Sequence, residues 1–140
     1  MVVGVDKLLD KTYHNKYALA VTQIPKKINV FFFKSDTGKM PVRDWLLGLP
    51  AEDRRIIGED IKTVEFGWPV GMPVVRPLGD KLYEVRSVLT NGDESRIIFT
   101  LFKSLMILLH GFVKKIKKTR QRDLDLAKNR MRKFLQDAQT

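Results

Sequence analysis

The chain has 140 residues, of which 44% are hydrophobic and 30% are charged, and it carries a formal net charge of +10 at pH 7. This length suits one domain with a modest core, and the hydrophobic content argues against a fully disordered chain. The absence of cysteine excludes disulfides, thiolate nucleophiles and cysteine metal sites.

No membrane segment is predicted. The most apolar stretch, residues 104–113, is far too short to span a bilayer. The first residues lack the layout of a secretory signal, because Asp6, Lys7, Asp10 and Lys11 interrupt their apolar residues. We therefore expect a cytoplasmic protein that makes no contact with a membrane.

Residues 1–27 are interpreted as an N-terminal extension, and residues 28–140 as the domain itself. The extension has weak helical spacing at Val5, Leu8 and Leu9. A short extra helix and a poorly ordered leader both remain open for it.

The domain begins with a strand over residues 28–33, because this run is β-branched and aromatic and ends at a turn over residues 35–38. Two short helices follow. Pro41 opens the first, and Pro50 ends it and opens the second, which stops at Gly67. Their apolar stripes have helical spacing: Val42, Trp45, Leu46 and Leu49 in one, and Ile57, Ile61 and Val64 in the other.

Residues 67–80 are rich in glycine and proline and are interpreted as a loop. Three strands then follow over residues 82–89, 95–102 and 105–113, with a hairpin turn at Asn91-Gly92. Short connections predict an antiparallel meander. The chain closes with a helix from about Thr119 to Gln136.

The element order is therefore β-α-α-β-β-β-α, which predicts an α+β domain. We expect the helices to cover one face of a small antiparallel sheet. The other face, or the rim where strands end, would then be left for a partner.

Positive charge is concentrated near the C-terminus. Ten of the 26 lysines and arginines lie in residues 114–133, opposed there only by Asp123 and Asp125. A one-signed excess of this kind is typical of a polyanion-binding site. The alternative is an ordinary solvated helix face, which is what charge runs usually are.

A set of side chains near this segment suits RNA cleavage. Alternation along a strand places Glu84 and Arg86 on the same side. Arg96 opens the second strand of the meander, His110 lies near the end of the third, and Lys114 follows it. Cleavage needs a base for the 2′-hydroxyl proton, an acid for the 5′-oxygen and cations for the phosphate. Each residue also has a structural alternative: a hydrogen-bonded core histidine, an in-sheet ion pair, a solvated lysine.

Neither a metal nor a cofactor is predicted. His14 and His110 are far apart in sequence, with no clustered carboxylates near either. The chain also has no glycine loop of the P-loop type.

The motifs of the C-terminal half resemble those of the HigB-like branch of the RelE/ParE toxin superfamily, to which phage-derived host-killing toxins belong. The most specific block is LLHGFVKKIKKT at residues 108–119, which leads into an Arg-x-x-Asp-Leu-x-x-Ala pattern. The upstream segment PVVRPLGDKLYEVR at residues 73–86 is also similar. The resemblance extends over about residues 28–136, and the 27 residues before it lie outside the pattern.

This resemblance implies a RelE-like fold and the toxin of a type II toxin–antitoxin pair. Toxins of this branch cleave mRNA, typically on the translating ribosome and without a metal, and a helix-turn-helix (HigA-like) antitoxin neutralises them. It implies a catalytic set of Glu84, Arg86, Arg96, His110 and Lys114, with proton transfer assigned to His110 or Glu84 and phosphate binding to the arginines. The implied RNA contacts are Lys115, Lys117, Lys118 and Arg120.

Two other functions stay open. A gyrase inhibitor of the ParE type would share the fold without nuclease chemistry. A non-catalytic nucleic-acid-binding module would use the basic helix to hold phosphates and would not need His110.

Overall fold

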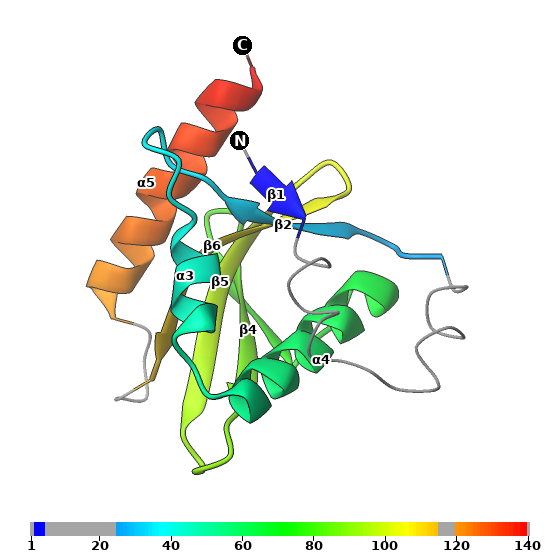
Figure 1. Cartoon of the computed structure of the whole chain (residues 1–140). Helices are drawn as coiled ribbons and strands as arrows, with labels where there is room; N and C mark the ends of the chain where they lie inside the picture. Colours follow the sequence, from blue (N-terminus) through cyan, green and yellow to red (C-terminus); the bar gives the residue numbers. More distant parts are fainter. Residues whose placement is uncertain (1, 5–24, 115–119, 140) are drawn as a thin grey trace.

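The structure is a computed structural model, and it describes residues 2–4, 25–114 and 120–139. Its strands are β1 (Val2–Gly4), β2 (Asn29–Phe33), β3 (Val75–Gly79), β4 (Leu82–Val88), β5 (Glu94–Phe102) and β6 (Leu105–Val113). Its helices are α3 (Pro41–Leu47), α4 (Ala51–Gly67) and α5 (Gln121–Ala138). The predicted α+β class and the β-α-α-β-β-β-α core are confirmed (Figure 1).

The six strands form one sheet in the order β1-β2-β6-β5-β4-β3. The predicted antiparallel meander is present as β4, β5 and β6. The sheet is nevertheless mixed, because β2 pairs in parallel with β6. Since α3 and α4 lie between β2 and the meander in the chain, they provide the long connection that a parallel pair needs.

The N-terminal extension begins with a strand, which neither alternative for it included. Residues 2–4 form β1, which pairs with the outer edge of β2. The apolar positions Val5, Leu8 and Leu9 fall in residues 5–24, outside the described part of the chain. The boundary at residue 28 stays a prediction.

The interpretation of residues 67–80 as a loop was wrong for their second half. Residues 75–79 form β3 at the edge of the sheet, where Arg76 faces Glu84 and Pro77 faces Tyr83. Proline cannot donate a hydrogen bond to a neighbouring strand, so in sheets it is confined to edges and bulges. The pairing shifts register directly after Pro77. The glycines and prolines therefore mark an irregular edge strand.

The expectation that the helices cover one face of the sheet was also wrong. Helices α3 and α4 pack on one face, where their residues meet Val30, Phe32, Ile97 and Phe99. Helix α5 packs on the opposite face with Ile98, Ile107 and Leu109 (Figure 1). The sequence contains the reason, because a strand buried on both faces does not alternate between polar and apolar residues. Such continuous apolar runs are Ile97-Ile98-Phe99 in β5 and Ile107-Leu108-Leu109 in β6.

No helix in the part of the chain that the structure describes is long and apolar enough to cross a membrane.

Gly111 is required by a close approach between β6 and α3. A Cβ atom at this position would lie 2.5 Å from Cε3 of Trp45 and 2.7 Å from its Cζ3. These distances are shorter than any ordinary van der Waals contact, and the indole ring is held by the core around it. Glycine at residue 111 therefore lets the first helix pack directly on the central strand.

We expect Gly111→Ala to destabilise the protein by about 1–3 kcal/mol, because the new methyl group overpacks the contact with Trp45. Urea unfolding followed by tryptophan fluorescence measures this change. Gly71→Ala is the matched control, since nothing lies within 4 Å of a Cβ atom at that position. Equal stability of the two variants would contradict the tight contact.

Candidate functional site

The register of the meander arranges the predicted site residues in rows on the face that α5 covers. Each row consists of residues paired across β4, β5 and β6. The first row holds Glu84, Ile98 and His110, and the second holds Arg86, Arg96 and Phe112. The third row holds Val88 and Glu94. Lys114 extends the third row, because its backbone N–H donates to the carbonyl of Glu94 at 2.8 Å. Neighbouring rows are two residues apart along each strand, or about 7 Å.

A fully buried ion pair lies at the centre of these rows. Nη1 of Arg96 donates to Oε1 of Glu84, and both side chains have an exposed fraction of 0%. Nη2 of Arg96 lies 2.5 Å from Oε1 of Glu94. The Nε–H of Arg96 has no acceptor among the described residues. Burial at this level makes the pair part of the framework of the sheet.

Glu94 joins the two arginines, and the sequence analysis did not single it out. Its Oε1 accepts a hydrogen bond of 3.0 Å from Nε of Arg86, and the same oxygen meets Arg96. Burial raises the pKa of Glu94, but the hydrogen bond from Arg86 and the charge of Arg96 outweigh it, so the pKa lies below its ordinary value. Glu94 therefore stays ionised between two cations.

The pattern that could have identified Glu94 is the period of a strand. Glu94 and Arg96 are two residues apart and share a face of β5, as Glu84 and Arg86 share a face of β4. Glu94 lies just outside the strand predicted over residues 95–102, which is why this pattern was missed.

Lys114 adds a third cation to the same place. Burial lowers its pKa, and the positive charge of Arg96 lowers it further, with a smaller contribution from Arg86. We call Glu84, Arg86, Glu94, Arg96 and Lys114 the charge cluster. It holds three cations and two carboxylates.

Exposure divides the charge cluster into an inner and an outer part. The side chains of Arg86 and Glu94 are 21% and 32% exposed, whereas those of Glu84 and Arg96 are completely covered. Lys114 is partly exposed. Arg86, Glu94 and Lys114 are therefore the members that a ligand can touch.

His110 lies on the same face of the sheet but is hydrogen-bonded to Asp123 of α5. Its Nε2 is 2.7 Å from Oδ1 of Asp123, and its ring stacks on Phe112 with a centroid distance of 5.3 Å. Burial lowers the pKa of His110 by more than the hydrogen bond to Asp123 raises it. The imidazole is therefore neutral at pH 7. Its row lies one step from Arg96 and two steps from Lys114.

Two polar contacts hold α5 against β6. One is the bond between His110 and Asp123. The other is donated by Nη1 of Arg130 to the carbonyl oxygen of Leu109 at 2.8 Å. Asp123 is buried. It was expected as one of two acids within the basic segment and as the aspartate of the Arg-x-x-Asp-Leu-x-x-Ala pattern, without a role at the site. Its pairing with a histidine thirteen residues earlier has no local signal.

The structure thus brings together four of the five predicted catalytic residues, with His110 beside them. Among the predicted RNA contacts, Arg120 is exposed directly before α5. Lys115, Lys117 and Lys118 fall in residues 115–119, outside the described residues. Within residues 2–4, 25–114 and 120–139, no group of three or more histidines and carboxylates could hold a metal ion.

We expect folding stability to fall as the pH drops from 7 to 5, partly because of His110. Its pKa is lowered in the folded state, so the unfolded chain binds more protons below about pH 6.5 and protonation favours unfolding. Urea midpoints measured across this range test the expectation. His110→Gln should show a smaller loss over the same interval. Identical pH dependence of the variant and the wild type would contradict the half-buried neutral imidazole.

The sequence was compared with curated proteins and with models of known protein families. A search of curated proteins finds no significant match. Residues 44–132 match the family described as Phage derived protein Gp49-like (DUF891). The match runs from α3 into α5, covers more than half of the chain, and includes His110 and the whole charge cluster. The chain therefore belongs to the phage-derived Gp49-like family, which is part of the RelE/HigB-type toxin superfamily.

Proposed function

We propose that this protein is the HigB-like toxin of a type II toxin–antitoxin pair and a metal-independent endonuclease that cleaves mRNA on the ribosome. Its partners in this proposal are mRNA, the ribosome and a helix-turn-helix antitoxin, all in the cytoplasm. Membership of the Gp49-like family supports the assignment as a toxin, and the charge cluster supports the proposed cleavage of RNA.

The observation that carries the proposal is the gathering of three cations around Glu94. Arg96 and Arg86 both lower the pKa of Lys114, so the three positive charges are close enough to repel one another. Glu94 and Glu84 offset part of this repulsion, so three cations against two carboxylates leave an excess of one positive charge for an anion. Perturbed groups of this kind concentrate at functional sites. A phosphate between Arg86 and Lys114 would relieve the repulsion.

The rows suggest how RNA cleavage would proceed. We place the phosphate at Arg86 in the middle row, with His110 in one neighbouring row and Lys114 in the other, both on β6. Cleavage forms a bond from the 2′-oxygen to phosphorus and breaks the bond from phosphorus to the 5′-oxygen. The entering and leaving oxygens lie on opposite sides of the phosphorus, which suits one proton-transfer group on each side.

In this proposal the neutral His110 accepts the proton of the 2′-hydroxyl, and Lys114 gives a proton to the 5′-oxygen. The lowered pKa of Lys114 moves this group toward the working pH, and the lowered pKa of His110 keeps its imidazole neutral and able to accept a proton. Arg86 binds the phosphate and stabilises the extra charge of the transition state. Glu84 and Arg96 cannot reach a substrate from their buried positions, so they act as positioning residues that hold Glu94 and Arg86.

We expect Arg86→Ala and Lys114→Ala each to reduce RNA cleavage by about 10²-fold or more, because each removes a group that stabilises the transition state. Primer-extension mapping of transcripts after induction in growing cells measures the cleavage. Growth arrest should be relieved in parallel. Arg43→Ala is the matched control, since this exposed arginine lies on α3, away from the charge cluster.

Two outcomes would contradict the endonuclease. Intact transcripts in cells arrested by the wild type, together with inhibition of gyrase supercoiling by purified protein, would favour the ParE-type alternative. Salt-dependent RNA binding without cleavage would favour the non-catalytic module. Cleavage lost in Arg86→Ala with RNA binding retained would reject that module.

A further inference from the structure

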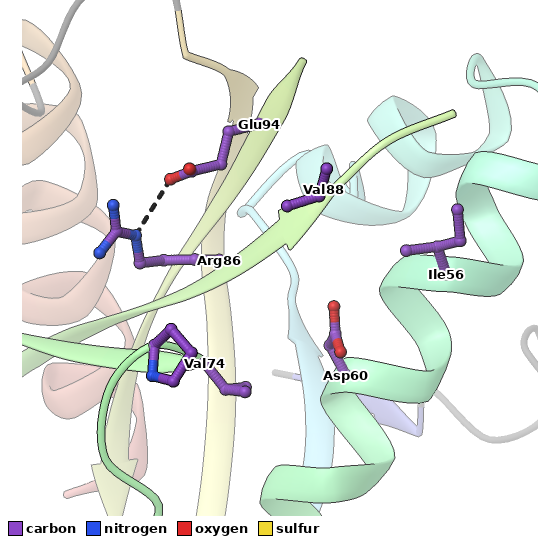
Figure 2. A pocket seen from close by; sticks show the side chains of 7 residues that line it. Ile56, Asp60, Val74, Arg86, Val88 and Glu94 are labelled. Carbon is purple, nitrogen blue, oxygen red and sulfur yellow. Dashed lines mark hydrogen bonds and ion pairs between the residues drawn. The ribbon is translucent and has the colours of Figure 1, made fainter. Parts of the chain in front are cut away.

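A pocket of about 410 Å³ adjoins the charge cluster at the edge of the sheet. Its lining includes Ile56 and Asp60 from α4, Val74 from the segment before β3, and Arg86, Val88 and Glu94 from the meander (Figure 2). Arg86 and Glu94 therefore belong both to the pocket and to the charge cluster. A phosphate bound at Arg86, as proposed above, would therefore adjoin this pocket.

The pocket exists because β3 covers only part of β4. The last contact between them is a hydrogen bond from the N–H of Arg86 to the carbonyl of Val74 at 2.8 Å. Beyond Arg86, no strand in the described part of the chain pairs with this edge. Val88 is 64% exposed, and its backbone N–H points outward like that of Arg86, two residues before it.

The opposite wall of the pocket is held in place by α4. Oδ1 of Asp53 accepts hydrogen bonds of 2.9 Å from both the N–H and the hydroxyl of Thr90, which ties the start of α4 to the turn after β4. Ile56 and Asp60 lie one and two turns further along this helix and face Val88 across the pocket (Figure 2). The width of the pocket is thus set by the fold.

Asp60 is the polar group on this wall. Burial raises its pKa, and the hydrogen bond from the Ser87 hydroxyl only partly opposes the effect. No cation within the described residues forms an ion pair with it. A carboxylate only accepts hydrogen bonds, so Asp60 favours a ligand that presents donors. Asp60 is thus a hydrogen-bond acceptor beside the apolar side chains of Ile56 and Val88, on a chain whose net charge is +10.

We propose that this pocket binds a guanine base of the RNA, next to the phosphate held at Arg86, and that Asp60 reads the base. Guanine presents two neighbouring donors, N1–H and the N2 amino group, which match the two oxygens of a carboxylate. Adenine, cytosine and uracil each present one donor group on that edge. Ile56, Val74 and Val88 supply apolar walls for the faces of the ring, as in other sites that take up unstacked bases.

This inference rests on the proposed endonuclease, because that function brings RNA to the charge cluster. The base pocket and the cleavage chemistry can nevertheless be tested separately. Binding of nucleotides to the purified protein reports on the pocket alone. Mapping of cleavage sites reports on both.

We expect guanosine 5′-monophosphate to bind about tenfold more tightly than inosine 5′-monophosphate, which differs from it only by lacking the N2 amino group. Titrations followed by amide NMR shifts measure both affinities, and the shifts should centre on Asp60 and Val88. Asp60→Asn should remove the preference, because an amide offers one acceptor and one donor group. Glu59→Gln should retain it, since Glu59 is an exposed neighbour on the same helix that pairs with Arg55.

No binding of guanosine monophosphate, or equal binding of the two nucleotides by the wild type, overturns the guanine pocket. In cells, wild-type cleavage sites should carry guanine at one fixed position beside the cut, and Asp60→Asn should cut without this preference. Cleavage without any guanine preference would reject the pocket and leave the endonuclease standing. Selective nucleotide binding without cleavage would support the pocket and reject the endonuclease.

Discussion

Arg96 and Glu84 form an ion pair inside the sheet, and the arrangement of the candidate site follows from it. Taking two charges out of water costs several kcal/mol for each ion, so the pair needs good geometry and further partners. Glu94 is the second partner of Arg96, and through it Arg86 is drawn to the same place. Apolar residues of similar size would fill the interior at least as stably. The charges of Arg96 and Glu84 are best explained by the side chains that they hold at the surface, which are Glu94 and Arg86.

The second constraint is that both faces of the sheet are covered. Helices α3 and α4 bury one face and α5 the other, so most of the central strands is closed to a ligand. The charge cluster lies where β4 and β6 end and β5 begins, and there the rows meet solvent. The contacts of His110 and Arg130 fix how far α5 extends over this end. The position of one helix thereby determines which charges a partner can reach.

Much of the fold was predictable because its signals are local. The aromatic run of β2, the prolines that open α3 and α4, and the Asn91-Gly92 turn each determine structure within a few residues. Edge strand β3 pairs with β4 directly after it, but its proline and glycine hide the pattern of a strand. The parallel pairing of β2 with β6 depends on a partner far away in the chain, which no local pattern reveals. The same holds for the site. Glu84 and Arg86 share a face by simple alternation, whereas Asp60 and Asp123 gain meaning only from the elements that pack against them.

The side of the sheet on which His110 lies depends on one extra residue. Ile98 pairs with His110 and Phe99 with Leu108, so Leu109 is a bulge in β6. Strict alternation would direct Leu109 toward α5 and His110 toward α3 and α4. With the bulge, Leu109 packs under α5 and His110 also faces α5, where it meets Asp123. The alternation then resumes with changed parity, so Gly111 faces Trp45 and Lys114 lies with Glu94. Bulges are found where a strand must redirect a side chain, often beside active sites. The one in β6 aligns the end of this strand with the charges of β4 and β5.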